Sequence, residues 1–232
     1  MKTQKEIWQD EHIKQATFNR MHSNRPSSPV KILVGFLKGR GYLPSQTYIL
    51  DLGCGKGRNS IYLASEGFKG LGVDFVKEAI REARKRRSNR LQKNLQFEVL
   101  DLTGEWPYSD SSFDAIIDCN VTTCIPSPGR ERAIAEAYRV LNPGGYYLFY
   151  GTASREPLVQ LQGPEPNSVI FPDSGKFEKQ YTREELLNTY VNFKFIKLDT
   201  KAGGDLIGGK ETAYSMWVGL FQKVAKVRRG VA

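Results

Sequence analysis

A short glycine-rich loop next to a carboxylate is the part of this sequence best suited to chemistry. It runs Asp51-Leu52-Gly53-Cys54-Gly55-Lys56-Gly57-Arg58 and follows a short apolar stretch. Glycines allow a tight turn and a close approach of the backbone to a ligand. A second carboxylate, Asp74, ends the next apolar stretch. This combination indicates a nucleoside cofactor whose ribose hydroxyls bond to the second carboxylate.

Two details of the loop distinguish NAD from S-adenosylmethionine (SAM), which both fit that pattern. NAD sites usually have the spacing GxGxxG and leave room for a pyrophosphate at the following helix, whereas the spacing here is GxGxG. Asp51 stands just before the loop, where its charge would repel a pyrophosphate but attract an ammonium or sulfonium group. The loop therefore favours SAM.

The segments around the loop alternate between strand and helix. Apolar stretches predict strands over 48–52, 70–73, 95–100, 113–119 and 146–150, and periodicity predicts helices over 58–66, 76–87 and 131–141. Strands separated by helices form a parallel sheet covered on both faces. After a helix start marked by Thr182 and Glu185, strands over 193–198 and 213–221 are predicted to form an antiparallel pair, joined by a glycine-rich connection.

Acidic residues end or follow the first four predicted strands: Asp51, Asp74, Asp101 and Asp118. Open parallel sheets bind ligands beyond the carboxyl ends of their strands. Four carboxylates at this one edge are expected to form a binding site.

Four ordered motifs resemble those of the class I SAM-dependent methyltransferases. They are Ile49–Gly57, Leu71-Gly72-Val73-Asp74-Phe75, Phe113–Asp118 and Ala137–Gly145, within residues 48–151. The resemblance implies an α/β fold with a Rossmann-like, doubly wound, mostly parallel seven-stranded sheet, an antiparallel C-terminal strand and three α/β/α layers. It also implies an enzyme that transfers a methyl group from SAM. The run Gly55–Ser60 is similar to small-molecule methyltransferases of the tellurite-resistance type.

The resemblance also implies a role for each matching residue. The loop glycines would line the methionine end of SAM, with Asp51 near its amino group. Asp74 would hold the ribose, Phe75 would pack on the adenine, and Asp101 and the Leu102 amide would bind the adenine edge. Asp118 and Cys119 would border the transferred methyl. The predicted cofactor-binding set is Asp51, Gly53, Cys54, Gly55, Gly57, Asn59, Asp74, Phe75, Asp101, Leu102, Asp118 and Cys119.

The whole chain, 1–232, is expected to be one methyltransferase domain. Residues 1–47, with helices over 2–20 and 30–38, would cover the site, and residues 48–152 would bind the cofactor. Residues 153–181 would form a long loop on the substrate side, and residues 182–224 the C-terminal helix and strand pair. The segment 120–128 would complete the substrate pocket. Positive side chains there make an anionic small molecule a plausible acceptor, although they could equally be solvated: Arg20, Arg25, Arg155, Lys176 and Lys179.

The sequence identifies no catalytic residue, no metal site and no oligomeric state. His12 and His22 are the two histidines, and each could be a base or an ordinary packing residue. Cys54, Cys119 and Cys124 lack the context of a catalytic thiol and form neither a disulfide framework nor a zinc motif. Without a signal core or an apolar run of about 18 residues, the chain is expected to be cytoplasmic and to have no membrane partner.

The net charge of +9 leaves other functions open. Much of it lies in the run 81–90, which is expected to be a solvated helix face but could contact nucleic acid. The alternatives to a small-molecule methyltransferase are an RNA or protein methyltransferase, a non-catalytic SAM-binding subunit and, least favoured, an NAD-dependent oxidoreductase.

Overall fold

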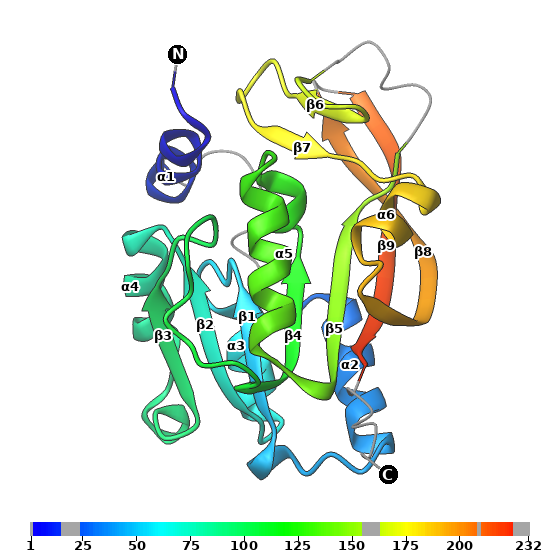
Figure 1. The fold of residues 1–232 in the computed structure, drawn as a ribbon. Coiled ribbons are helices and arrows are strands. Elements are labelled where there is room, and N and C mark those ends of the chain that lie inside the picture. Colours follow the sequence, from blue (N-terminus) through cyan, green and yellow to red (C-terminus); the bar gives the residue numbers. More distant parts are fainter. Residues whose placement is uncertain (1, 15–23, 155–162, 208–209, 225–232) are drawn as a thin grey trace, which may run out of the picture.

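A seven-stranded sheet organises the chain, in the order β3-β2-β1-β4-β5-β9-β8 (Figure 1). The computed structural model describes residues 2–14, 24–154, 163–207 and 210–224. The first five strands of that order are parallel, and β9 runs antiparallel to both of its neighbours. The predicted fold class is therefore confirmed. The strands are β1 (Tyr48–Leu52), β2 (Lys69–Asp74), β3 (Leu95–Val99), β4 (Phe113–Cys119), β5 (Leu141–Thr152), β8 (Phe193–Ile207) and β9 (Lys210–Lys223).

Helices cover both faces of the sheet, because its central strands are apolar on both sides. On β4, Ile116 packs with the buried side of α5, whereas Ala115 and Ile117 pack with α2 and α3. The helices are α1 (Gln4–Lys14), α2 (Ser28–Gly39), α3 (Arg58–Ser65), α4 (Lys77–Arg86), α5 (Gly129–Val140) and α6 (Arg183–Thr189). The 3-10 turns are η1 (Pro44–Gln46), η2 (Asn89–Leu91) and η3 (Thr122–Cys124).

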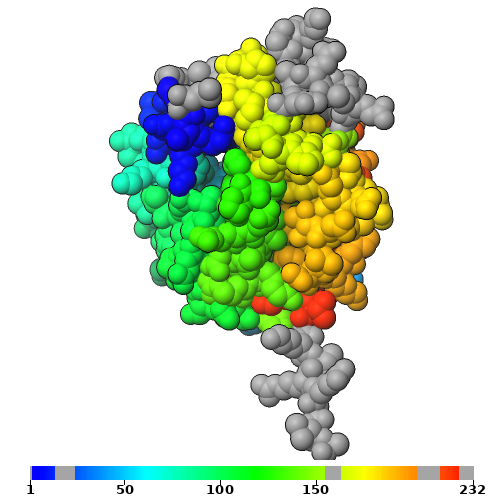
Figure 2. Space-filling model, turned by 45° about the horizontal axis from the view of Figure 1, so that its top comes forward, coloured from blue at the N-terminus to red at the C-terminus, as the bar shows by residue number. Residues whose placement is uncertain are grey.

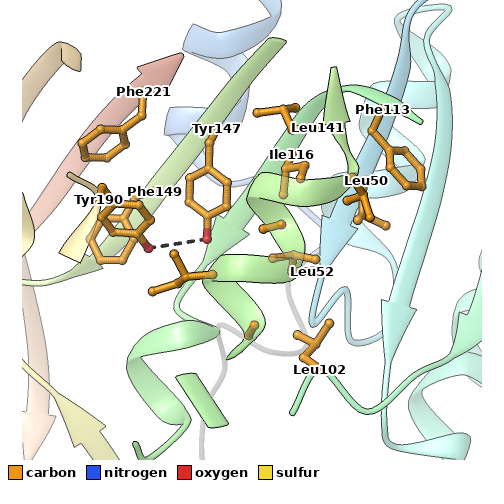
Figure 3. Packing of buried hydrophobic residues seen from close by; sticks show 14 of the residues in the cluster. Leu50, Leu52, Leu102, Phe113, Ile116, Leu141, Tyr147, Phe149, Tyr190 and Phe221 are labelled. Carbon is orange, nitrogen blue, oxygen red and sulfur yellow. Dashed lines mark hydrogen bonds between the residues drawn. The ribbon is translucent and has the colours of Figure 1, made fainter. Parts of the chain in front are cut away.

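An aromatic cluster joins the parallel part of the sheet to its antiparallel end (Figure 3). Tyr190, just after α6, stacks on Phe221 of β9 with 4.7 Å between ring centroids. Its hydroxyl lies 3.5 Å from that of Tyr147 on β5. Because these rings come from segments on both sides of the insertion 153–181, they anchor α6 and the last two strands to the core.

Two regions differ from the sequence-based expectation. The insertion expected to be a loop contains a two-stranded antiparallel sheet, β6 (Ser168–Ile170) and β7 (Phe177–Lys179). Three-residue strands are too short to give a periodic pattern. The glycine-rich connection expected between the last two strands is itself mostly paired, so β8 and β9 form one long hairpin. The capping box of Thr182 and Glu185 is present as predicted.

Candidate cofactor and acceptor site

The glycine loop between β1 and α3 has a backbone that only glycine tolerates. Gly53, Gly55 and Gly57 have φ angles of 51°, 54° and 82°. A Cβ atom on Gly53 would lie 2.6 Å from Val121 Cγ2, and one on Gly57 would lie 2.7 Å from Phe97 Cζ. The Cys54 amide donates to the Val73 carbonyl at 2.9 Å and ties the loop to β2. The loop is thus a rigid backbone cradle at the carboxyl edge of the sheet.

Asp51 lies beneath this cradle and is 2% exposed. Its carboxylate accepts a hydrogen bond from the Ser60 hydroxyl. Burial raises the pKa of Asp51 to about 7, although the Ser60 hydroxyl and the Arg58 charge both oppose the shift. A cationic group arriving beside Asp51 would favour its ionised form.

Asp74, at the end of β2, uses both carboxylate oxygens to hold the loop. Oδ2 accepts from the Gly55 amide and Oδ1 from the Val76 amide, each at 2.9 Å. Burial raises the pKa of Asp74, and these two amides and His12 oppose that shift. Each oxygen keeps a second lone pair, so the carboxylate can still accept from a ribose hydroxyl.

The adenine side of the predicted site lies at the same edge. Asp101 follows β3 and accepts from the Thr103 amide at 3.0 Å and the Thr103 hydroxyl at 2.7 Å. It also forms an ion pair with Lys5 of α1. Phe75 is half-buried after β2, and Leu102 is buried with its carbonyl accepting from the Trp106 indole. These positions are compatible with the roles that the resemblance implied.

Two of the predicted residues have clear structural partners. Asp118 is completely buried and accepts from the Tyr147 hydroxyl at 2.7 Å, the Val121 and Thr122 amides, and the Thr122 hydroxyl. It therefore holds the turn from β4 into η3. The buried side chain of Asn59 accepts from the Ser27 amide at 2.9 Å and fixes the start of α2. Cys119, at the end of β4, is half-buried, and burial raises the pKa of its thiol.

Helix α1 lies against the glycine loop, on the site that the N-terminal segment was expected to cover. The ring of His12 is 8% exposed, and its Cε1 lies 3.6 Å from the place of a Cβ on Gly55. Within the described parts of the chain, its buried Nδ1 has no hydrogen-bond partner. Burial lowers the pKa of His12, and the nearby Asp74 carboxylate opposes that shift. The imidazole is therefore neutral at pH 7 and can bond to a ligand.

The same helix contacts the β6–β7 hairpin. The Gln4 side chain donates to the Gly175 carbonyl and accepts from the Phe177 amide, both at 2.8 Å. Figure 2 shows the dark-blue helix beside the yellow hairpin on one face of the molecule. Two segments that are far apart in the sequence, α1 and the β6–β7 hairpin, thus cover the carboxyl edge of the sheet together.

The residues at this edge fit SAM. Gly53 and Gly57 let the loop pack directly on Val121 and Phe97, and without side chains of its own at these positions the loop presents its backbone to a ligand. The His12 ring lies against Gly55 of the same loop through Cε1, and its buried Nδ1, which has no hydrogen-bond partner among the described residues, can bond to a ligand. Two buried carboxylates, Asp51 and Asp74, suit the ammonium and ribose groups of SAM.

Comparison with known proteins agrees with this geometry. A family model described as a methyltransferase domain matches residues 49–145. A crystal structure of a SAM-dependent methyltransferase from Methanosarcina mazei is 27% identical, with a TM-score of 0.68, and the match covers 82% of this chain and 98% of the other. These matches support a class I SAM-dependent methyltransferase, with the family model covering residues 49–145.

Two other proteins that are similar to this chain have named substrates. A 2-heptyl-1-hydroxyquinolin-4(1H)-one methyltransferase from Mycobacteroides abscessus is 32% identical over 122 residues, which are 52% of each chain. A Burkholderia thailandensis 1,6-didemethyltoxoflavin-N1-methyltransferase, solved with its acceptor and S-adenosylhomocysteine, has the same fold. Its TM-score is 0.69 at 14% identity, and the match covers 96% of this chain and 87% of the other. The chain spans about half the length, or less, of the first curated relatives that it matches.

Two of the lysines that were expected to carry positive charge around the acceptor are neutralised by ion pairs in the structure. Lys176 forms an ion pair with Glu11 at 2.9 Å, and Lys179 forms one with Glu185 at 2.7 Å. Both lysine side chains are 7% exposed. Arg25 is exposed. The remaining predicted candidates, Arg20, His22 and Arg155, lie outside the described residues.

Proposed function

We propose that this methyltransferase moves the methyl group of SAM to a small-molecule acceptor by in-line displacement. The proposal rests on the glycine cradle, on the buried carboxylates of Asp51 and Asp74, and on the buried Nδ1 of His12, which has no hydrogen-bond partner among the described residues. When bound, SAM would supply a methyl group on a sulfonium, which is a good leaving group. The protein has to orient the acceptor and exclude water.

The roles of the individual residues follow from their positions. Asp51 would bind the amino group of the cofactor, Asp74 its ribose, and Phe75, Asp101 and the Leu102 amide its adenine. Cys54 and Asn59 would shape the loop rather than contact reacting atoms, since one is tied to β2 and the other to α2. Asp118 would act through the turn that it holds, with Cys119 at the rim.

The covering of the site supports a small acceptor. Helix α1 is hydrogen-bonded to the β6–β7 hairpin across the carboxyl edge of the sheet, which limits the size of what can reach the cradle. We therefore propose that residues 48–152 bind SAM and that 1–47 and 153–181 build the acceptor side. The quinolone and toxoflavin-type acceptors in the names of two relatives belong to the same size class.

The basic run on α4 supports the RNA alternative less well. Arg84 and Arg87 donate to the carbonyls of Phe97 and Leu95 on β3, so part of this charge binds the protein's own backbone. Among the described residues, no helix is long and apolar enough to cross a membrane. The three cysteines are free thiols, which supports the proposed cytoplasmic location.

The test is to follow formation of S-adenosylhomocysteine from SAM across amines, phenols, thiols and oxyanions. Turnover with a small acceptor would support the proposal. Tight SAM binding without turnover of any acceptor would favour a non-catalytic subunit. Turnover of RNA only, with affinity that falls steeply as salt rises, would favour the RNA alternative.

A further inference from the structure

We propose that Glu178 on β7 binds the methyl acceptor through an N–H or O–H group and receives the proton that methylation releases. The acceptor is then a protic nitrogen or oxygen compound, neutral or cationic, and not an anion. This inference rests on the proposed function and adds the substrate class.

The position of Glu178 follows from how the hairpin is attached. Strand β7 packs on η3, the turn that follows β4. Immediately after β7, the Tyr181 amide donates to the Thr152 carbonyl at 3.0 Å, which joins this segment to the end of β5. Glu178 therefore lies over the carboxyl ends of β4 and β5, on the side of the sheet edge where an acceptor would approach the cradle.

The surroundings of Glu178 are polar but neutral. Burial raises the pKa of its carboxyl, and the side chains of Thr152 and Gln180 offset only part of that shift through hydrogen bonds. Burial also raises the pKa of the Cys124 thiol on η3 to about 12, with the Glu178 charge adding to it. Glu178 is half-buried, so part of the residue remains accessible at the surface.

The cations next to Glu178 in the sequence are directed elsewhere. Lys176 pairs with Glu11, and its ammonium lies 4.7 Å from the centre of the Trp8 ring. Lys179 pairs with Glu185 and also donates to the Pro166 carbonyl at 2.7 Å. An anionic acceptor would meet the Glu178 carboxylate without a free ammonium from either lysine. An N–H or O–H group of a neutral or cationic acceptor could donate a hydrogen bond to the same carboxylate.

The proposed step transfers a methyl group to the acceptor and a proton from it. Methylation of an N–H or O–H acceptor forms a C–N or C–O bond and breaks the sulfur–methyl bond, whose electron pair remains on sulfur. The acceptor's proton passes to a Glu178 oxygen and then to water. A carboxyl with a raised pKa is a better base for this transfer than an ordinary one.

The first test measures binding and needs no knowledge of the natural acceptor. Phenol, benzylamine and benzoate are titrated into protein saturated with S-adenosylhomocysteine, for the wild type, Glu178→Gln and, as a control, Glu184→Gln at an exposed position of α6. We expect the wild type and the control to bind phenol and benzylamine at least about tenfold more tightly than benzoate. Glu178→Gln should lose that preference, because a charge-assisted hydrogen bond contributes about 1.5–3 kcal/mol, or roughly 10- to 150-fold.

The second test uses the best acceptor found by S-adenosylhomocysteine release. Glu178→Gln should lower kcat/KM by about 100-fold or more and leave the affinity for S-adenosylhomocysteine unchanged. The inference is overturned if benzoate binds as tightly as benzylamine, if none of the three probes binds at millimolar concentration, or if Glu178→Gln keeps the wild-type preference. Failure of the wild type to bind S-adenosylhomocysteine would instead contradict the proposed function.

Discussion

Replacing Gly57 by alanine separates the two reasons for a glycine in the loop. Gly57 and Gly144 have the same φ of 82°, but an added Cβ meets Phe97 at 2.7 Å in the loop and nothing within 4 Å at Gly144. The left-handed backbone costs an alanine about 1–2 kcal/mol at either position. Overpacking against Phe97 adds about 1–3 kcal/mol at Gly57 alone.

We therefore expect Gly57→Ala to be about 2 kcal/mol less stable than Gly144→Ala, a difference of about 4–8 °C in Tm for a chain of this size. Gly57→Ala should also weaken the binding of S-adenosylhomocysteine by at least about tenfold, since the cradle has to move. Gly144 lies near the start of β5, at the opposite edge of the sheet. Urea unfolding and calorimetric titration of both variants measure these effects. Equal stability and equal affinity of the two variants would refute this account of the loop.

Three further predictions concern buried charges. In Asp74→Asn, the new side-chain NH2 group faces one of the two backbone amides that donate to Asp74, so the free energy of unfolding measured in urea should fall by about 1–3 kcal/mol. Calorimetry should show weaker binding of S-adenosylhomocysteine, and unchanged affinity would rule out the ribose role. Because the folded pKa of Asp51 is about 7 against an ordinary 3.8, its share of stability falls as the pH rises between those values. The affinity for S-adenosylhomocysteine should rise several-fold from about pH 6 to about pH 8, and Asp51→Asn should remove most of this pH dependence. If Asp51→Asn kept the pH dependence of the wild type, Asp51 would not be the group that binds the amino group. Arg130→Met leaves the half-buried Glu165 carboxylate without its 2.6 Å ion pair and should cost about 1–3 kcal/mol in urea unfolding, of which a second change, Glu165→Leu, should restore a part.

The glycine loop and its place between β1 and α3 were predictable because their information is local. The loop glycines, Asp51 and Asp74 lie within one strand–helix–strand unit, where the spacing of residues reports the geometry directly. The same holds for the capping box at Thr182, which is a contact over three residues.

The contacts between α1 and the β6–β7 hairpin were not predictable, since they join segments that are distant in the sequence. Gln4 and Phe177 are 173 residues apart, and neither residue type signals the other. The expectation of an anionic acceptor counted Lys176 and Lys179 without their partners, which α1 and α6 supply. Because both lysines are paired, the proposed acceptor contact is the Glu178 carboxylate that lies between them in the sequence.

We propose that the cradle at the carboxyl edge of the sheet binds SAM and not NAD. Calorimetric titration of the wild-type protein with SAM, S-adenosylhomocysteine and NAD measures this preference directly. We expect one site per chain for SAM and S-adenosylhomocysteine and no detectable heat with NAD. Tight binding of NAD without binding of SAM would contradict the claim.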